Sequence, residues 1–259
     1  MRMMKKVLGT VTVLALSVSL LAGCGSTAAS PVSSVASTAA ESTTSSVVSE
    51  TTSAAADENV AAAAQLLNDL TGSYQELWPV ILADEYQQTW LDDCTALVGE
   101  ENAEAAFEKL SSMVTGDVYG EDAVEAYANG GGAFFCGFTN SLATLTFDGE
   151  TSTISGTDKD GNVLFSHTYH YIGMEPVHGL YEFESDDADS GEFTYFFLAP
   201  DTSAETYHIE FRYGSDAEAL SQYDAGEYAY WVASGISTDC DQTMIDNCIE
   251  LFCTENLAG

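Results

Sequence analysis

The sequence predicts a mainly β, α+β protein in which a meandering antiparallel barrel has helices before it and after it. Two observations lead to this fold class. Apolar residues recur at helical spacing in the first half of the domain, whereas from Ala133 onward they alternate at the two-residue period of strands. Turn pairs at Asp148-Gly149 and Asp160-Gly161 then separate short extended segments of regular spacing. Such spacing is typical of a sandwich or a barrel, and we expect a barrel.

The first half of the domain carries the helical pattern in three segments, residues 59–70, 77–89 and 102–114. In the third segment Phe107, Leu110 and Met113 or Val114 fall on one face, as in an amphipathic helix. Glycines fill positions 130–132 after a helix-like segment. A phosphate-binding loop would follow a strand, so we interpret this triplet as a hinge between the two halves.

The second half of the domain carries the strand pattern. Leu142, Thr144 and Thr146 alternate with Leu145 and Phe147 directly before the first turn pair. The remaining extended segments are residues 162–172, 180–183, 193–198 and 206–213.

Helices are expected again at the C-terminal end. The segments Ser215 to Glu218 and Thr238 to Asp241 both resemble capping boxes, in which a hydroxyl residue starts a helix and an acidic residue follows three positions later. The last of these helices has an apolar face formed by Met244, Ile245, Cys248, Ile249, Leu251 and Phe252.

The N-terminal region predicts export and lipid anchoring. A basic stub is followed by an apolar run over residues 7–21 that is too short to span a bilayer, and residues 1–23 are therefore predicted to be a removable signal peptide. The run ends in Leu21-Ala22-Gly23-Cys24, the lipobox pattern, which makes Cys24 the expected lipidation site. Two kinds of acyl chain on Cys24 would give a stable membrane anchor. We expect an extracytoplasmic protein, at the cell surface or in the periplasm.

The mature chain has two predicted parts. Residues 24–56 are rich in Ser, Thr and Ala and contain no aromatic residue, so they are predicted to be a flexible linker. Residues 57–259 are predicted to form one globular domain. The whole chain has 6 basic against 41 acidic residues, and only Lys109, Lys159 and Arg212 remain basic once the signal is removed. Such a chain repels nucleic acid and anionic membranes and attracts cations or basic ligands.

The sequence lacks the usual catalytic and disulfide signatures. Apart from Cys24 there are five cysteines, an odd number, with no Cys-x-x-Cys spacing, and most are expected to be small core residues. No Gly-x-Ser-x-Gly elbow and no His-Glu-x-x-His helix occurs. Enzymatic activity therefore has no support, and we expect a binding protein.

The histidines are the candidate nitrogen ligands for a metal. His167 and His170 are three apart on a predicted strand and should point to opposite faces, and His178 falls in a loop. His208 differs, because Thr206 and Glu210 flank it at the two-residue period and should share its face.

A family resemblance adds to these patterns. The segment Leu70-Thr71-Gly72-Ser73-Tyr74-Gln75-Glu76-Leu77-Trp78-Pro79, the later segment Phe193-Thr194-Tyr195-Phe196-Phe197-Leu198-Ala199-Pro200, and Tyr207-His208-Ile209 resemble the ZinT/YodA family of exported zinc- and cadmium-binding proteins. The aromatic stretch Gly226-Glu227-Tyr228-Ala229-Tyr230-Trp231 and the acidic closing helix resemble that family too, so the likeness runs from about residue 67 to residue 257.

The resemblance implies a lipocalin-like (calycin) barrel that holds a metal near its mouth through three histidines. Carried onto this chain, those positions fall at Phe196, Thr206 and His208, of which only His208 is a histidine. The metal, zinc or another divalent cation, would then be held by His208 with carboxylates such as Glu210 or Glu205, and with another histidine brought close by folding. Added oxygen ligands would suit a harder ion such as calcium or manganese. A metal transporter is the candidate partner.

Two other functions stay open at the level of sequence. A barrel without metal could bind a small organic or peptide ligand at a mouth lined by Tyr195, Phe196 and Tyr207. Alternatively, the chain could be a structural or interaction lipoprotein without any small ligand. A dry, filled barrel interior would favour the second of these over the first.

Overall fold

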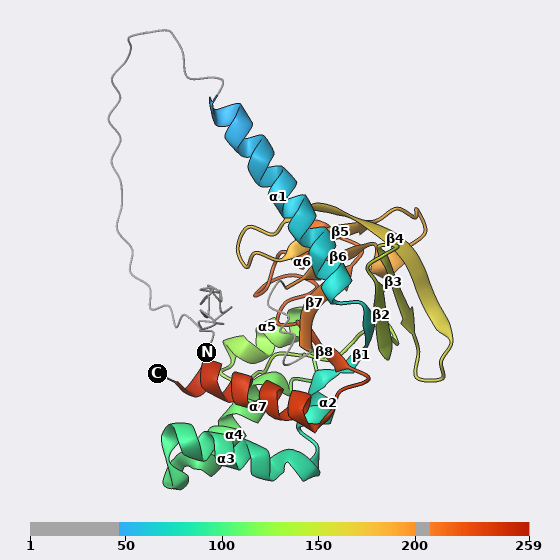
Figure 1. The fold of residues 1–259 in the computed structure, drawn as a ribbon. Coiled ribbons are helices and arrows are strands. Elements are labelled where there is room, and N and C mark those ends of the chain that lie inside the picture. The colour runs from blue at the N-terminus through green and yellow to red at the C-terminus, as the bar shows by residue number, and fades with distance from the viewer. Residues whose placement is uncertain (1–46, 200–207, 259) are drawn as a thin grey trace, which may run out of the picture.

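A closed barrel of eight antiparallel strands is the centre of the molecule (Figure 1). The computed structural model describes residues 47–199 and 208–258, with side chains from Glu58 onward. The signal segment, Cys24, residues 24–46 of the linker, and the candidate residues Glu205, Thr206 and Tyr207 lie outside the described residues.

The strands follow one another around the barrel in chain order, and the first closes on the last. This up-and-down order is the lipocalin-like arrangement, so the predicted fold class is confirmed. The strands are β1 (Gly72–Glu76), β2 (Thr144–Asp148), β3 (Thr153–Thr157), β4 (Val163–Met174), β5 (Tyr181–Ser185), β6 (Tyr195–Leu198), β7 (His208–Gly214) and β8 (Ala233–Ser237).

Helices precede, interrupt and follow this barrel. They are α1 (Val47–Asp69), α2 (Leu77–Ile81), η1 (Asp84–Tyr86), α3 (Gln87–Val98), α4 (Glu100–Val114), α5 (Glu121–Ala128), η2 (Gly191–Phe193), α6 (Ala217–Leu220) and α7 (Gln242–Leu257). Helices α3, α4 and α7 pack together as a separate group on one side of the barrel, below it in Figure 1. No helix among the described residues combines the length and apolar character needed to cross a membrane.

Three helical predictions need correction. The segment predicted as one helix over residues 77–89 is divided into α2, η1 and the start of α3. Pro79 fits α2 because it lies in the first turn, where a backbone N–H has no partner within the helix. Helix α1 begins at Val47, inside the segment predicted as linker. The two capping boxes are also wrong in register, because the caps are Asp216 for α6 and Asp241 for α7.

Aromatic side chains fill the barrel interior. Phe147, Phe183, Phe196, Phe211 and Tyr213 are at most 1% exposed. The ring of Phe196 lies against those of Tyr169, Phe211 and Tyr213, with centroids 5.4–6.3 Å apart. From one end, Ala63, Leu66 and Leu67 of α1, and Leu70 directly after it, join the same apolar cluster. An interior filled by side chains in this way disfavours a ligand held inside the barrel.

The second apolar cluster lies outside the barrel, between its wall and the helical group. Ile236 of β8 packs there with Trp78 and Ile81 of α2, Trp90 of α3 and Ile249 of α7. The indole N–H of Trp90 donates to the carbonyl of Ile81 at 2.7 Å. This cluster holds α2 and α7 against the outer faces of β7 and β8, which positions the candidate site.

Candidate functional site

Strand β7 places His208 and Glu210 on the outer face of the barrel wall. Their β8 partners are Ile236 and Ser234, and Ile236 belongs to the outer apolar cluster. The intervening Ile209 belongs to the barrel core. The prediction that His208 and Glu210 share a face therefore agrees with the strand register, and that face looks away from the barrel interior.

His208 and Glu210 line a small pocket between β7, α2 and α7. Its other walls are Leu77, Trp78, Ile81, Cys248, Leu251, Phe252 and Glu255. The pocket has a volume of about 30 Å³. A cavity of about 10–15 Å³ already holds one water molecule, so this volume suits a single ion or a water or two.

The donor atoms of this pocket are one imidazole and two carboxylates, with a thiol beside them. Glu255 adds a carboxylate from the last turns of α7. Burial raises the pKa of the Cys248 thiol to about 12, and the charge of Cys240 adds to the rise. A thiol must lose its proton to bind a metal well. We therefore interpret Cys248 as an apolar residue of the pocket wall and not as a ligand. The remaining set of one nitrogen and several oxygens suits borderline or hard divalent cations.

The three-histidine arrangement implied by the resemblance does not fit this chain. Phe196 is completely buried in the aromatic barrel core, whereas His208 faces outward, so the two positions lie on opposite sides of the barrel wall. In the part of the chain that the structure describes, no group of three or more His, Cys, Asp or Glu side chains is placed to hold a metal ion. A site at His208 therefore cannot copy that arrangement, and His208, Glu210 and Glu255 line one pocket without forming a complete ligand set by themselves.

The other three histidines are engaged elsewhere, and none of them lines the His208 pocket. His167 and His170 point to opposite faces of β4, as predicted. The Nδ1 atom of His167 lies 2.8 Å from Asp187, and that of His170 lies 2.7 Å from Asp186. The ring of His178 lies tilted against that of Tyr223, with ring centroids 3.8 Å apart. The expectation that folding would bring a second histidine to His208 is not met by the described residues.

Glu255 is the pocket residue that the sequence reasoning missed. It follows Cys248 by seven positions and Phe252 by three, so it continues the predicted apolar face of α7. The available sequence signal for Glu255 was a carboxylate at the end of the apolar face of a helix.

Comparisons with known proteins give similarity in structure only. No protein-family model and no curated protein sequence matches this chain. The structure is similar to the Zn(II)-bound ZinT-like domain of Streptococcus pneumoniae AdcA, with 16% identity, a TM-score of 0.45, and coverage of 71% of this chain and 89% of that one. It is also similar to Zn(II)-bound AdcA from the same organism, with 14% identity, a TM-score of 0.42, and coverage of 72% and 35%. The ZinT type of domain is the one that the sequence resembles.

Proposed function

We propose that this chain is an extracytoplasmic lipoprotein that binds a divalent cation at the outer face of β7. His208 and Glu210 are its central ligands, with Glu255 opposite them on α7. The observation that carries this proposal is that one imidazole and two carboxylates line a single ion-sized pocket. We further propose a binding role without catalysis.

The neighbouring sequence supports additional oxygen ligands. Asp201 and Glu205 precede β7 directly in the chain, so the segment before His208 is itself acidic. Zinc accepts mixed sets of histidine and carboxylate, and manganese or calcium is favoured as oxygen replaces nitrogen.

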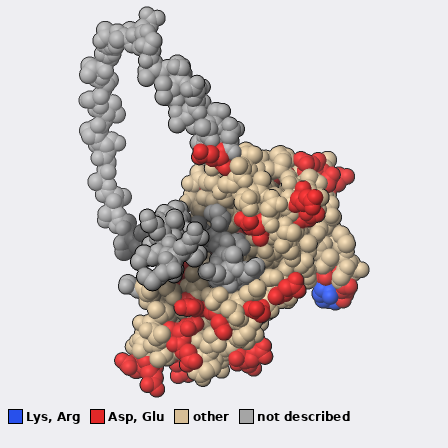
Figure 2. Space-filling model, viewed as in Figure 1, with Lys and Arg blue, Asp and Glu red and all other residues tan. Residues whose placement is uncertain are grey.

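The charge of the molecule supports a cationic ligand of this kind. Acidic side chains are spread over the face shown in Figure 2, where basic side chains form a single small patch. A surface with this imbalance raises the local concentration of cations and speeds their arrival. The same surface charge also binds cations weakly and without a defined site. An experiment has to separate this weak binding from binding at a specific site.

Metal content and affinity of the full, tag-free chain in detergent test this proposal. We expect one equivalent of zinc, manganese or calcium by elemental analysis and calorimetry. His208→Ala should weaken binding at least about tenfold, since even partners outside the first ligand shell cost 10- to 100-fold. The matched control is His170→Ala, which removes an exposed histidine paired with Asp186 and should leave the affinity unchanged.

Two results would overturn the proposal. One is weak binding that both variants share and that disappears in moderate salt, because surface charge alone behaves in this way. The other is a tight site that survives His208→Ala. If no metal site exists, the filled barrel would favour a structural or interaction role for this lipoprotein.

Membrane attachment needs its own test. We propose that Cys24 carries the lipid anchor and that a metal transporter is the partner that receives the ion. Cys24→Ala should abolish acylation and move the chain from the membrane fraction to the soluble fraction. Unchanged fractionation and acylation would contradict the assignment.

A further inference from the structure

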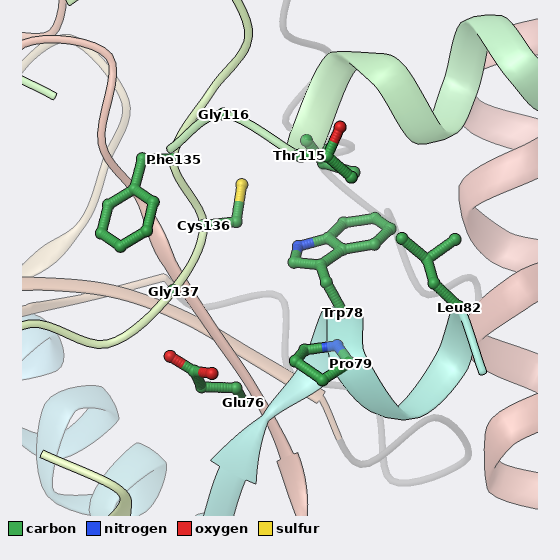
Figure 3. Close-up of a pocket in the computed structure, with 10 residues that line it drawn as sticks. Glu76, Trp78, Pro79, Leu82, Thr115, Gly116, Phe135, Cys136 and Gly137 are labelled. Atoms are coloured by element: carbon green, nitrogen blue, oxygen red, sulfur yellow. The ribbon is translucent and has the colours of Figure 1, made fainter. Parts of the chain in front are cut away.

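A larger cleft lies on the other side of α2, separate from the His208 pocket. It has a volume of about 340 Å³ and is bounded by the end of β1, by α2, and by the chain segments 114–116 and 135–137. Figure 3 shows its lining, in which Glu76, Trp78, Thr115, Phe135 and Cys136 surround a common space. Cavities of about 300 Å³ and above are in the range that small organic ligands occupy.

Trp78 presents a poorly satisfied hydrogen-bond donor in this cleft. The residue is only 8% exposed, and its buried Nε1 atom has no oxygen acceptor, with only the sulfur of Cys136 as a weak partner. The indole nitrogen points toward Cys136 across the cleft (Figure 3), whose sulfur is at best a weak acceptor. Since a buried donor with only a weak partner is costly, a ligand that brings an acceptor oxygen would gain by binding here.

Glu76 presents a carboxylate on the same cleft. Its Oε1 atom accepts the backbone N–H of Phe138 at 2.6 Å, which fixes the carboxylate in place. Among the ion pairs of the described residues, none involves Glu76. Of the three basic side chains in residues 24–259, Lys159 pairs with Asp160, Arg212 is buried among backbone carbonyls, and Lys109 forms no ion pair with Glu76. The Glu76 charge therefore has no counterion among the described residues.

The rest of the cleft is apolar and unreactive. Pro79, Leu82, Val114 and Phe135 form its walls. Burial raises the pKa of the Cys136 thiol far above its usual range, and the charge of Glu210 adds to the rise. The thiol therefore stays protonated and is a poor nucleophile, which argues for reversible binding.

We propose that this cleft binds a small organic ammonium compound that has an apolar body and a hydrogen-bond acceptor close to the charge. The ammonium group would pair with Glu76, the acceptor would take the N–H of Trp78, and the body would lie against Leu82 and Phe135. The acidic surface of the chain favours such a cation over any anionic ligand.

Three probes of the same body separate these contributions in calorimetric titrations of the full chain. Leucinamide has the ammonium group, a carbonyl acceptor and an isobutyl body. Isoamylamine lacks the acceptor, and 4-methylpentanamide lacks the ammonium group. We expect leucinamide to bind most tightly, isoamylamine about three- to tenfold more weakly, and 4-methylpentanamide at least about tenfold more weakly.

Variants assign the two polar contacts. Glu76→Gln keeps an oxygen for Phe138 N–H and should weaken both amines at least about tenfold. Its control is Glu104→Gln, which removes an exposed charge on α4 and should change neither. Trp78→Phe should weaken leucinamide about three- to tenfold and leave isoamylamine unchanged, because only leucinamide uses the indole N–H.

A further variant tests the cleft without changing a buried residue, so that loss of binding cannot result from misfolding of the core. Thr115 is exposed at the cleft, so Thr115→Trp should fold normally and abolish binding of both amines by filling the space. Equal affinity of all three probes, or binding that survives Glu76→Gln and Thr115→Trp, would overturn the proposal. His208→Ala should leave leucinamide binding intact, which distinguishes failure of this site from failure of the metal site.

Discussion

Arg212 is completely buried, as is Glu175, and it shows how one side chain can hold a loop. Its guanidinium donates to the carbonyls of Leu220 and Tyr228, and to that of Gln222 at 3.2 Å. It also lies 4.1 Å above the centre of the Tyr223 ring. Burial lowers its pKa, and the neighbouring Tyr223 opposes that shift. One cation on β7 thus fastens the segment after α6 to the outer wall of the barrel.

Replacing Arg212 should therefore be strongly destabilising. Arg212→Met retains much of the apolar stem but leaves three carbonyls without donors, and we expect a loss of about 3 kcal/mol in the free energy of unfolding. Urea denaturation followed by circular dichroism measures it. Lys159→Met, which removes an exposed cation, should stay within about 0.5 kcal/mol. A loss below about 1 kcal/mol for Arg212→Met would show that water replaces the guanidinium.

At the residue scale the sequence predicted part of the site. The two-residue period correctly placed His208 and Glu210 on one face of a strand, but it could not say which face looks inward. Strand β7 is buried on both sides over Phe211 to Gly214, so its pattern carries no contrast between the core and the outside. Phe196, the position onto which the family resemblance carries the first histidine, lies in the barrel core.

Helix α7 begins at a different residue from the one its sequence suggested. Asp241 accepts the backbone N–H of Met244 at 3.0 Å, whereas Thr238 precedes the helix and pairs its own N–H with Ser73. We expect Asp241→Ala to cost about 1 kcal/mol of unfolding free energy through the lost cap. Thr238→Ala should cost less than about 0.5 kcal/mol. Thermal and urea unfolding of the two variants decide which residue caps the helix, and equal losses would contradict this placement.

The contact between α3 and α7 brings acidic side chains together. Partial burial raises the pKa of Asp93, and the charges of Glu250 and Asp246 on α7 raise it further. A carboxyl group whose pKa is raised on folding costs stability above that folded pKa. The cost fades as pH falls, and it is gone below the pKa of the unfolded state.

Asp93→Asn should therefore stabilise the protein at neutral pH. We expect a few tenths of a kcal/mol, because the group is only partly buried and solvent still screens its charge. The gain should shrink as the pH of urea titrations is lowered from 8 toward the ordinary pKa of an aspartate, about 3.9. Glu104→Gln on α4 serves as the control for loss of an exposed charge. A gain that is independent of pH would contradict this assignment.

At the element scale the predicted extended segments match β2, β4, β5, β6 and β7, whereas β1, β3 and β8 were missed. Strand β1 is Gly-Ser-Tyr-Gln-Glu, which contains one large apolar residue. Strand β8 is Ala-Ser-Gly-Ile-Ser, and its first four residues are all buried because the barrel core covers one face and the outer apolar cluster covers the other. Strand β1 has too few apolar residues to alternate, and the small residues of β8 are buried on both faces, so only the closure of the barrel reveals these two strands.

Helix α2 separates the two cavities. Trp78 lines both the His208 pocket and the cleft at Glu76. No local sequence signal could have indicated this, because it depends on how the helical group packs against the barrel wall.

At the scale of the whole molecule, charge imbalance is the main feature. The formal net charge is −35 at pH 7, and self-repulsion of this size destabilises the compact state. Raising NaCl from about 20 mM to about 500 mM shortens the Debye length severalfold and should raise the melting temperature. Differential scanning calorimetry with a chelator present measures this without a contribution from bound divalent ions. A melting temperature that is flat or falls with salt would show that the acidic groups are too far apart to matter.

The scarcity of basic residues also bears on proteolysis. Trypsin cuts after Lys and Arg, and residues 24–259 contain only Lys109, Lys159 and Arg212. Arg212 is fully buried, and Lys109 lies within α4, where the backbone is not extended. Lys159 stands exposed in the turn between β3 and β4, a loop tip of the kind that proteases prefer. The folded domain therefore offers trypsin a single accessible bond, and the strands on either side of that cut would still be paired with each other.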